Sequence, residues 1–355
     1  MKKIGFVINY IVKNGPSSVL LNIINNIDRK EFEPSIITLF DGNDKKVIKY
    51  LNEHNVTVHQ CKSLSRMKCI LGINKEFNKI VKTENYDILH THGFIPDILS
   101  SRIKIHTKKI STIHNNMFED YFDVYGSLKS KIFIKMHIRA LRNLDENVCC
   151  AKSVYDVMKK YLKNVSYICN GIEGKKVYSK ITRRQLNIPD DAKVFLYAGV
   201  LNTGKNIVWL VKNFVKYHND KEYFIVLGSG EKEKECIRCA DENVIFLGFQ
   251  NNSMEYMSLS DIYVSASKSE GFSISVLEAM SQGLGLLLSD IPSHREVLEM
   301  GNNIYLGELF KDNDFENALI ELRKHSLNKN EIQIFQNQEL SAKKMTIKYQ
   351  NKYVK

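Results

Sequence analysis

The sequence predicts two α/β domains of the Rossmann-like, doubly wound type, each built on a parallel sheet, facing each other across a cleft. Strand-like and helix-like segments alternate from one end of the chain to the other, which is typical of parallel sheets covered by helices. The alternation is interrupted by a stretch without clear periodicity over residues 172–193. The 355 residues are enough for two domains, each with a core of its own.

The first array of elements begins at the N-terminus. Gly15 and Pro16 break the chain after a first apolar run, and a helix is predicted over Ser17–Asp28, where apolar residues recur on one face. Several of the apolar runs end in polar or glycine residues, and ligands of open parallel sheets bind beyond the carboxyl ends of the strands. The strands predicted in this array are Lys3–Ile8, Ser35–Leu39, Val56–His59, Asp87–His92, Lys109–His114, Glu146–Cys150 and Val165–Ile168.

The second array follows a turn at Asn170-Gly171 and a linker over Ile172–Lys193. A last helix is predicted over Glu339–Tyr353. The chain is therefore divided into a first domain over 1–171, a second over 172–338 and a final helical segment over 339–355. The strands predicted in the second array are Val194–Ala198, Phe224–Leu227, Val244–Leu247, Ile262–Ser265 and Leu286–Ser289.

The charge of the chain is unevenly distributed. Residues 1–180 hold 30 Lys and Arg against 17 Asp and Glu, a net +13, whereas residues 181–355 hold 21 against 23, a net −2. A nucleic-acid-binding protein would not usually carry its excess of basic residues in one half only, and no nucleic-acid-binding motif is present. No nucleic-acid partner is therefore expected. The basic half could bind an anionic lipid or an anionic acceptor, or it could simply be a solvated lysine-rich surface.

The N-terminus superficially resembles a signal peptide. Its apolar stretch within Met1–Tyr10 is short and interrupted by Asn9, and no small-residue cleavage site follows. No apolar run approaches the roughly 18 residues that span a bilayer. We therefore interpret this segment as a first strand and expect a cytoplasmic protein.

Two acidic residues, Glu270 and Glu278, stand eight positions apart around a predicted strand-to-helix turn. The first follows the buried strand Ile262–Ser265, and the second lies on the helix. A helix N-terminus offers unpaired N–H groups and partial positive charge, which suit a phosphate. Two carboxylates beside it can accept hydrogen bonds from sugar hydroxyls. The pattern therefore suits a nucleotide-diphospho-sugar, although a capped core helix with two surface acids would show the same spacing.

The same segment resembles the donor-site signature of the retaining glycosyltransferases of family 4, which have the GT-B fold. That signature is Glu-Gly-Phe-Gly followed, after seven residues between the glutamates, by Glu-Ala-Met. Ser273 stands where a glycine is usual. The resemblance runs over nearly the whole chain and implies that the last helix crosses back to the first domain. The residues that match are Glu270, Gly271, Phe272, Glu278, Ala279 and Met280.

A lysine in a strand-to-helix loop, Lys205, can meet a diphosphate as a point charge. It lies in a segment that resembles the family motif Gly-Arg-Leu followed by Lys-Asn, whose arginine and lysine together hold the donor diphosphate. Lys205 and Asn206 match this motif. Val200 stands where the arginine belongs, which is the most consequential departure from the family pattern.

Three segments in the first half complete the resemblance. Gly15 lies in a loop like the family's first-domain glycine loop, which borders the donor phosphates. His114 ends a strand in a segment similar to Thr-x-His-(Asp/Asn), whose histidine reaches the donor sugar; a polar strand end is the alternative. His90 and His92 resemble a segment that lines the same cleft, and alternation places both on one face of a strand.

No metal site is expected. His90 and His92 lack a third ligand in the sequence. Asp312-Asn313-Asp314 matches the Asp-x-Asp motif of another glycosyltransferase fold, but it precedes a predicted helix over Phe315–Leu322. Asp314 is more simply a helix N-cap.

A basic amphipathic helix is predicted over Ser127–Arg142. Such a helix can lie on a membrane surface, or pack one face on the core and expose the other to solvent. The first possibility would place the protein peripherally on the inner face of the plasma membrane. Its cationic face holds Lys131, Lys135, Arg139 and Arg142, and its apolar face holds Ile134, Ile138 and Leu141.

The resemblance implies a metal-independent, retaining hexosyl- or N-acetylhexosaminyltransferase whose nucleotide-sugar donor, expected to be UDP-linked, takes the place of a cofactor. The acceptor would be a glycan or lipid-linked glycan of a bacterial surface polysaccharide. Because of Val200, a non-catalytic subunit that binds a nucleotide sugar or a partner enzyme is the alternative. The catalytic residues implied are Glu270 and His114, and the donor-binding residues are Gly15, Lys205, Asn206, Gly271, Phe272, Ser273 and Glu278.

Overall fold

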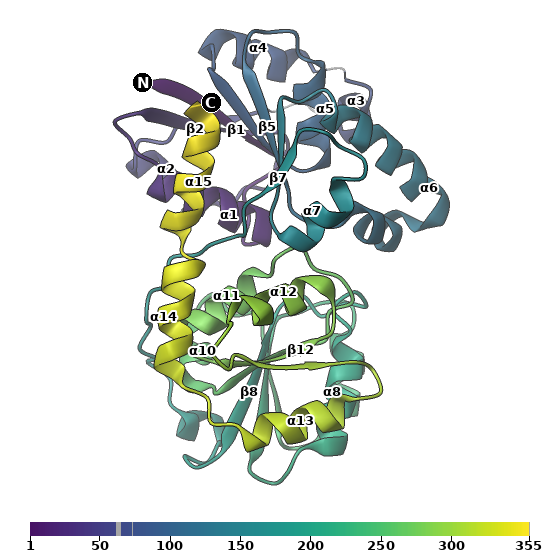
Figure 1. The fold of residues 1–355 in the computed structure, drawn as a ribbon, viewed down its shortest axis with the longest axis vertical. Helices are drawn as coiled ribbons and strands as arrows, with labels where there is room; N and C mark the ends of the chain where they lie inside the picture. The colour runs from purple at the N-terminus through teal and green to yellow at the C-terminus, as the bar shows by residue number, and fades with distance from the viewer. Residues whose placement is uncertain (62–64, 73, 355) are drawn as a thin grey trace. The chain divides into compact units, whose positions relative to one another are not determined.

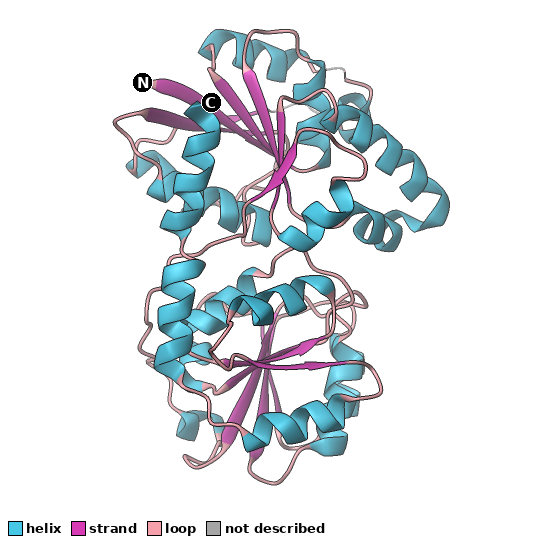
Figure 2. Cartoon of the chain, viewed as in Figure 1, coloured by secondary structure: helices cyan, strands magenta, loops and turns pink. Residues whose placement is uncertain are grey.

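The computed structural model of the chain describes residues 1–61, 65–72 and 74–354. It divides into two compact units, Met1–Gly171 with Ala342–Lys355, and Ile172–Ser341. Each unit has a parallel sheet covered by helices (Figure 1, Figure 2). The prediction of two Rossmann-like α/β units is thereby confirmed.

The first unit is built on a parallel sheet of seven strands in the order β3-β2-β1-β4-β5-β6-β7. Its register sets Ile8, the last residue of β1, opposite both Thr38 and His92. The order reverses between β1 and β4, and such reversals are where ligands of open α/β sheets bind. The strands are β1 (Lys2–Ile8), β2 (Phe32–Thr38), β3 (Val58–Gln60), β4 (Ile88–His92), β5 (Lys108–Ile113), β6 (Glu146–Cys149) and β7 (Val165–Tyr167).

The helices of the first unit bury apolar faces against this sheet. The first of them is capped by Asn14, whose side chain accepts a hydrogen bond from the Ser17 N–H at 2.9 Å. The helices are α1 (Gly15–Asn26), α2 (Lys45–Glu53), α3 (Arg66–Ile70), α4 (Lys75–Glu84), α5 (Phe94–Arg102), α6 (Met117–Leu141), α7 (Lys152–Met158) and α15 (Ala342–Val354).

The last helix, α15, belongs to the first unit although it is the end of the chain. Tyr353 and Tyr349 are fully buried, and their hydroxyls bond His90 Nδ1 at 2.7 Å and Thr112 Oγ1 at 3.0 Å. The helix begins at Ala342 rather than at Glu339, because Glu339 ends the preceding helix, α14 (Lys329–Glu339). The predicted single helix over Glu339–Tyr353 is therefore wrong at its start.

The second unit has six parallel strands in the order β10-β9-β8-β11-β12-β13. The edge strand β13 has no counterpart among the predicted strands. Within the predicted linker, Thr182 caps a short 3₁₀ helix, Arg183–Leu186. The strands are β8 (Lys193–Ala198), β9 (Glu222–Leu227), β10 (Val244–Gly248), β11 (Ile262–Ser265), β12 (Gly285–Ser289) and β13 (Gly307–Phe310).

The helices of the second unit enclose a core centred on residues such as Phe195, Leu210 and Phe224. The order of this sheet reverses between β8 and β11, so the loops that follow these two strands are neighbours. Besides α14, the helices are α8 (Ile207–Tyr217), α9 (Glu233–Cys239), α10 (Ser253–Leu259), α11 (Ile274–Ser281), α12 (Pro292–Met300) and α13 (Phe315–Lys324).

Helix α6 differs from the predicted basic helix over Ser127–Arg142. It begins ten residues earlier, at Met117, and kinks at Gly126, whose φ of 73° lies in the left-handed region. Ile138 and Leu141 are buried, so for these two residues the structure supports the second possibility, an apolar face packed on the core. Exposed apolar side chains on this helix include Leu128, at 76% exposure, Phe122, at 55%, and Ile132, at 54%.

The cations predicted on α6 are exposed, namely Lys131, Lys135, Arg139 and, just past its end, Arg142. Within the described ranges, no helix is both long enough and apolar enough to cross a membrane.

Candidate active site

Two loops meet at the point where the second sheet reverses its strand order. One follows β8 and contains Lys205; the other follows β11 and contains Glu270. The N–H of Lys268 donates to the carbonyl of Gly204 at 2.9 Å, which ties the loops together. Beside them, Gly228 has a φ of +132° and approaches Gly199 so closely that a Cβ there would lie 1.8 Å from the Gly199 carbonyl oxygen. Only glycine is compatible with this packing.

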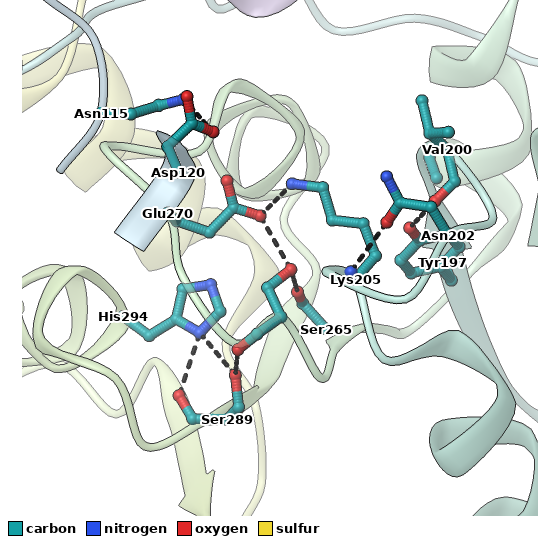
Figure 3. A network of polar contacts seen from close by, with 12 residues as sticks. Asn115, Asp120, Tyr197, Val200, Asn202, Lys205, Ser265, Glu270, Ser289 and His294 are labelled. Atoms are coloured by element: carbon teal, nitrogen blue, oxygen red, sulfur yellow. Dashed lines mark hydrogen bonds and ion pairs between the residues drawn. The ribbon is translucent and has the colours of Figure 1, made fainter. Parts of the chain in front are cut away.

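Glu270 forms an ion pair with Lys205 across these loops, shown in Figure 3. The Ser267 hydroxyl donates to the same carboxylate oxygen, Oε1, at 2.8 Å. Ser267 in turn lies 3.1 Å from the Ser265 hydroxyl. The side chain of Glu270 is only 14% exposed, and Lys205 is 31% exposed. A buried carboxylate is thus held beside a cation whose other side reaches solvent.

The charge of Glu270 is maintained by its partners. Burial alone would raise the pKa of this carboxyl, but Lys205, with a smaller contribution from the Ser267 hydrogen bond, lowers the pKa below its ordinary value. Glu270 is therefore ionised at neutral pH and can only accept hydrogen bonds. Such a group suits ligand hydroxyls.

Helix α11 starts directly after this loop. Ser273 is its N-cap residue, and its side chain makes no capping hydrogen bond. The backbone N–H groups of its first turn lack partners four residues earlier, as in any α-helix, and give this end partial positive charge. Glu278 lies on the helix and Glu270 on the turn before it, as predicted. Gly271 and Phe272 are both buried between the two.

The Lys205 loop is fixed by its own hydrogen bonds. The N–H of Lys205 donates to Asn202 Oδ1 at 2.9 Å, and Asn206 is the N-cap residue of α8 with a left-handed φ of 52°. The hydroxyl of Tyr197 donates to the carbonyl of Val200 at 2.9 Å. The Val200 side chain, which stands where the family has arginine, is 56% exposed. This position faces open space and supplies no charge.

The candidate residues of the first unit lie at the carboxyl edge of its own sheet. A cavity of about 220 Å³ there is lined by His92 and His114, and by Asn14 and Pro16 on either side of Gly15. His92 Nδ1 lies 2.9 Å from His114 Nε2, and the two rings stack with centroids 5.1 Å apart. One ring nitrogen must carry a proton and the other must not, so the pair shares one hydrogen bond.

Burial keeps these histidines neutral. It lowers the pKa of His114 to about 4 and, with a contribution from His114, that of His90 to about 3. The pKa of His92 is lowered well below its ordinary value by burial and by both neighbouring histidines. At neutral pH the three rings therefore act as hydrogen-bonding groups and not as cations.

Comparison with known proteins covers both units. The model of Glycosyltransferase Family 4 matches residues 13–175, and that of Glycosyl transferases group 1 matches residues 179–339. The chain is 29% identical over 313 residues to the O-antigen biosynthesis glycosyltransferase WclY of Escherichia coli, covering 84% of this chain and 82% of the relative. The chain belongs to glycosyltransferase family 4. The family indicated by the donor signature is thus confirmed.

Further relatives of this glycosyltransferase agree. It is 25% identical over 289 residues to the UDP-Gal:alpha-D-GlcNAc-diphosphoundecaprenol alpha-1,3-galactosyltransferase of Escherichia coli, covering 73% of this chain and 72% of that one. Among solved structures, Anabaena Alr3699/HepE in complex with UDP and glucose matches with a TM-score of 0.80 at 16% identity, over 100% of both chains. That likeness confirms the GT-B fold.

The structure of the glycosyltransferase brings Lys205, Glu270 and the start of α11 together in the second unit. In the first unit, it places His114 and the neighbours of Gly15 at one cavity. Within the described residues, no group of three or more His, Cys, Asp or Glu is arranged to hold a metal ion. Asp314 is the N-cap residue of α13, as predicted, although its Oδ1 accepts from the Asn317 side chain, at 2.6 Å, and not from the backbone.

Ser267 and His294 belong to the same network but carry no sequence signal of their own. A serine two residues after a strand and a single histidine in a helix are both ordinary. Only the proximity of Ser267 to the donor signature, three residues before Glu270, could have indicated a role.

Proposed function

We propose that this glycosyltransferase moves a hexosyl or N-acetylhexosaminyl group from a UDP-sugar, with retention at the anomeric carbon, to a glycan or lipid-linked acceptor during synthesis of a bacterial surface polysaccharide. The observation that supports this best is the buried Glu270 carboxylate paired with Lys205 beside the start of α11. The Glu270 carboxylate can accept hydrogen bonds from sugar hydroxyls. Beside it, Lys205 and the start of α11 are two sources of positive charge for a diphosphate.

The proposed roles follow from this chemistry. Lys205 and the N–H groups at the start of α11 stabilise the diphosphate as negative charge develops on the leaving group. Glu278 accepts hydrogen bonds from the ribose hydroxyls, and Glu270 from hydroxyls of the transferred sugar. His114, neutral at pH 7, meets the sugar as a hydrogen-bonding group. No bound metal takes part in this scheme.

The acceptor class rests on the relatives. The name of the galactosyltransferase relative describes a diphosphoundecaprenol-linked acceptor, and that of WclY describes O-antigen biosynthesis. The basic first 180 residues, with a net +13, suit an anionic lipid-linked substrate or membrane. On α6, exposed Leu128 and Ile132 accompany exposed cations. We therefore propose a protein that works in the cytoplasm, at the inner surface of the plasma membrane.

The decisive experiment is a UDP-release assay over a panel of nucleotide sugars, each with and without lipid-diphosphate acceptors. We expect one UDP-sugar to be consumed in an acceptor-dependent way, and the anomeric configuration of the product to match that of the donor. The alternative motivated by Val200, a non-catalytic subunit, predicts UDP-sugar binding without release. Inversion of configuration would contradict the retaining mechanism alone.

A further inference from the structure

His294 lies on α12, next to the candidate donor site, and is 1% exposed. Its Nδ1 is 2.9 Å from the Ser289 carbonyl oxygen and 3.2 Å from the Ser289 hydroxyl. A carbonyl oxygen can only accept, so Nδ1 carries the proton. The Ser289 hydroxyl is itself engaged as a donor to the Ser267 carbonyl at 2.6 Å. The tautomer of the neutral ring is thus fixed from the Ser289 side.

The other ring nitrogen, Nε2, is consequently a bare lone pair. It is buried, and among the described residues no donor lies within hydrogen-bond distance of it. Burial lowers the pKa of His294, with Glu270 partly opposing this, so the ring is neutral at pH 7. Figure 3 shows the ring with Nδ1 towards Ser289 and Nε2 on the side of Glu270. A buried acceptor without a donor is costly, of the order of tenfold in an equilibrium constant or more, and calls for a ligand or water.

The neighbourhood has more acceptors than donors. Among the described residues, Lys205 and Ser267 donate hydrogen bonds to Glu270. Both bond the same carboxylate oxygen, Oε1. The Ser267 and Ser289 hydroxyls already donate, and the Nδ1 proton of His294 is taken by Ser289. Among the described residues, two acceptors here therefore have no donor: the buried His294 Nε2, and Glu270 Oε2 on a carboxylate that is 14% exposed. A ligand that brings two neighbouring O–H groups would satisfy both.

We propose that His294 is a specificity-determining residue of the donor site, whose Nε2 accepts a hydrogen bond from one hydroxyl of the transferred sugar while Glu270 Oε2 accepts one from the adjacent hydroxyl. The inference rests on the proposed function and deepens it, because it names a vicinal diol on the sugar ring as the recognised group. Lys205 pairs with Glu270 without ligand; a diphosphate draws the ammonium towards itself and opens the carboxylate and the imidazole to the sugar.

The test uses His294→Asn. The asparagine amide occupies the place of Nδ1 and keeps a donor for the Ser289 carbonyl, but it has no atom at the Nε2 position. His325→Asn is the matched control, because His325 Nδ1 also contacts a backbone carbonyl, that of Glu321 at 3.0 Å, on an exposed helix end. Titration calorimetry measures the Kd of UDP, UDP-glucose, UDP-galactose and UDP-N-acetylglucosamine for all three proteins.

We expect His294→Asn to bind UDP as the wild type does and to bind the preferred UDP-sugar about tenfold more weakly. His325→Asn should match the wild type throughout. Equal weakening of UDP and UDP-sugar, or no weakening, overturns the inference. If no UDP-sugar binds the wild type, the proposed donor class is wrong and the inference falls with it. This outcome is distinct from equal weakening of UDP and UDP-sugar in His294→Asn.

A second measurement needs no variant and covers the case in which His294→Asn does not fold. Analogues of the preferred UDP-sugar that lack one ring hydroxyl are titrated into the wild type. We expect loss of the hydroxyl at either of two adjacent ring positions to raise the Kd about tenfold, because a site built to bond a hydroxyl rejects the analogue without it. In folded His294→Asn, removal of one of these two hydroxyls should cost nothing further. Uniform tolerance of all deoxy analogues would rule out direct recognition by His294 and Glu270.

Discussion

Glu270 and Glu278 stand eight residues apart on either side of the start of α11, yet their surroundings differ. Glu270 is buried and paired with Lys205, so its carboxylate is held in one position and its negative charge is retained. Glu278 is half-buried on the helix. A fixed, desolvated carboxylate suits interactions that matter in the transition state, whereas an accessible one suits binding of the nucleotide.

We predict that Glu278→Ala weakens UDP binding by about 1.5–3 kcal/mol, the usual worth of hydrogen bonds to a charged group. Glu270→Ala should instead lower kcat by on the order of a hundredfold, because an interaction with the reacting sugar is lost. Calorimetry with UDP and steady-state kinetics check the two halves. Glu299→Ala, an exposed acid on α12, is the control. Unchanged UDP affinity in Glu278→Ala, or unchanged kcat in Glu270→Ala, would refute the corresponding half.

At the scale of elements, α15 and the ends of β4 and β5 form a buried polar cluster. His90 bonds Tyr353 and Thr112, both at 2.7 Å, and His92 contacts His114. The cluster makes the C-terminal helix part of the first unit. This packing requires the imidazoles of His90, His92 and His114 to stay unprotonated.

We predict that the first unit loses stability as pH falls below about 6.5, the ordinary pKa of histidine. The unfolded chain takes up protons there, whereas folded His90 and His114 resist protonation down to about 3 and 4. Stability is therefore present above 6.5 and lost as the pH falls towards these values. Each histidine contributes about 2 kcal/mol to the loss between pH 7 and pH 5.

Urea unfolding at pH 7 and pH 5, followed by circular dichroism, measures this loss. His92→Asn should remove the contribution of one histidine to the pH dependence of the free energy of unfolding. His54→Asn, which changes an exposed histidine, should leave that pH dependence unchanged. An identical pH dependence in wild type and His92→Asn would show that the cluster does not stay neutral.

Helix α6 presents exposed cations that can contact an anionic membrane surface. Each cation near an anionic surface adds about 1 kcal/mol, and salt screens the attraction. We expect binding to anionic liposomes that weakens as salt rises, and loss of most of it when Lys131, Lys135, Arg139 and Arg142 are replaced by glutamine. UDP affinity should be retained. Leu128→Ser with Ile132→Ser tests the exposed apolar contribution. A wild type that does not bind anionic liposomes at low salt would show that the basic half is only a solvated surface.

At the scale of the whole molecule, the enzyme is predicted to need no divalent metal. In the proposed scheme, Lys205 and the start of α11 provide the positive charge that a bound metal ion provides in metal-dependent enzymes. We expect full turnover after treatment with a chelator and no gain on adding magnesium or manganese. Loss of activity in chelator, restored by either ion, would contradict this scheme.

Local patterns in the sequence were enough to predict the alternation of strands and helices, the restart after residue 171 and the donor signature around Glu270 and Glu278. These features are local, because periodicity, glycine turns and helix starts depend on residues close together in the chain. The edge strand β13 and the start of α15 were beyond it. A four-residue strand with only one buried residue and a break between two consecutive helices leave too weak a pattern.

Which side chains meet depends on how distant segments fold together. Lys205 and Glu270 are 65 residues apart and pair because β8 and β11 are neighbours in the sheet order. His294 gains a bare, buried Nε2 only because Ser289 holds the opposite nitrogen. Ile138 and Leu141 turn inward while Leu128 and Ile132 face out. Side-chain direction, burial and hydrogen-bond satisfaction arise when distant segments close on one another, and no local pattern contains that information.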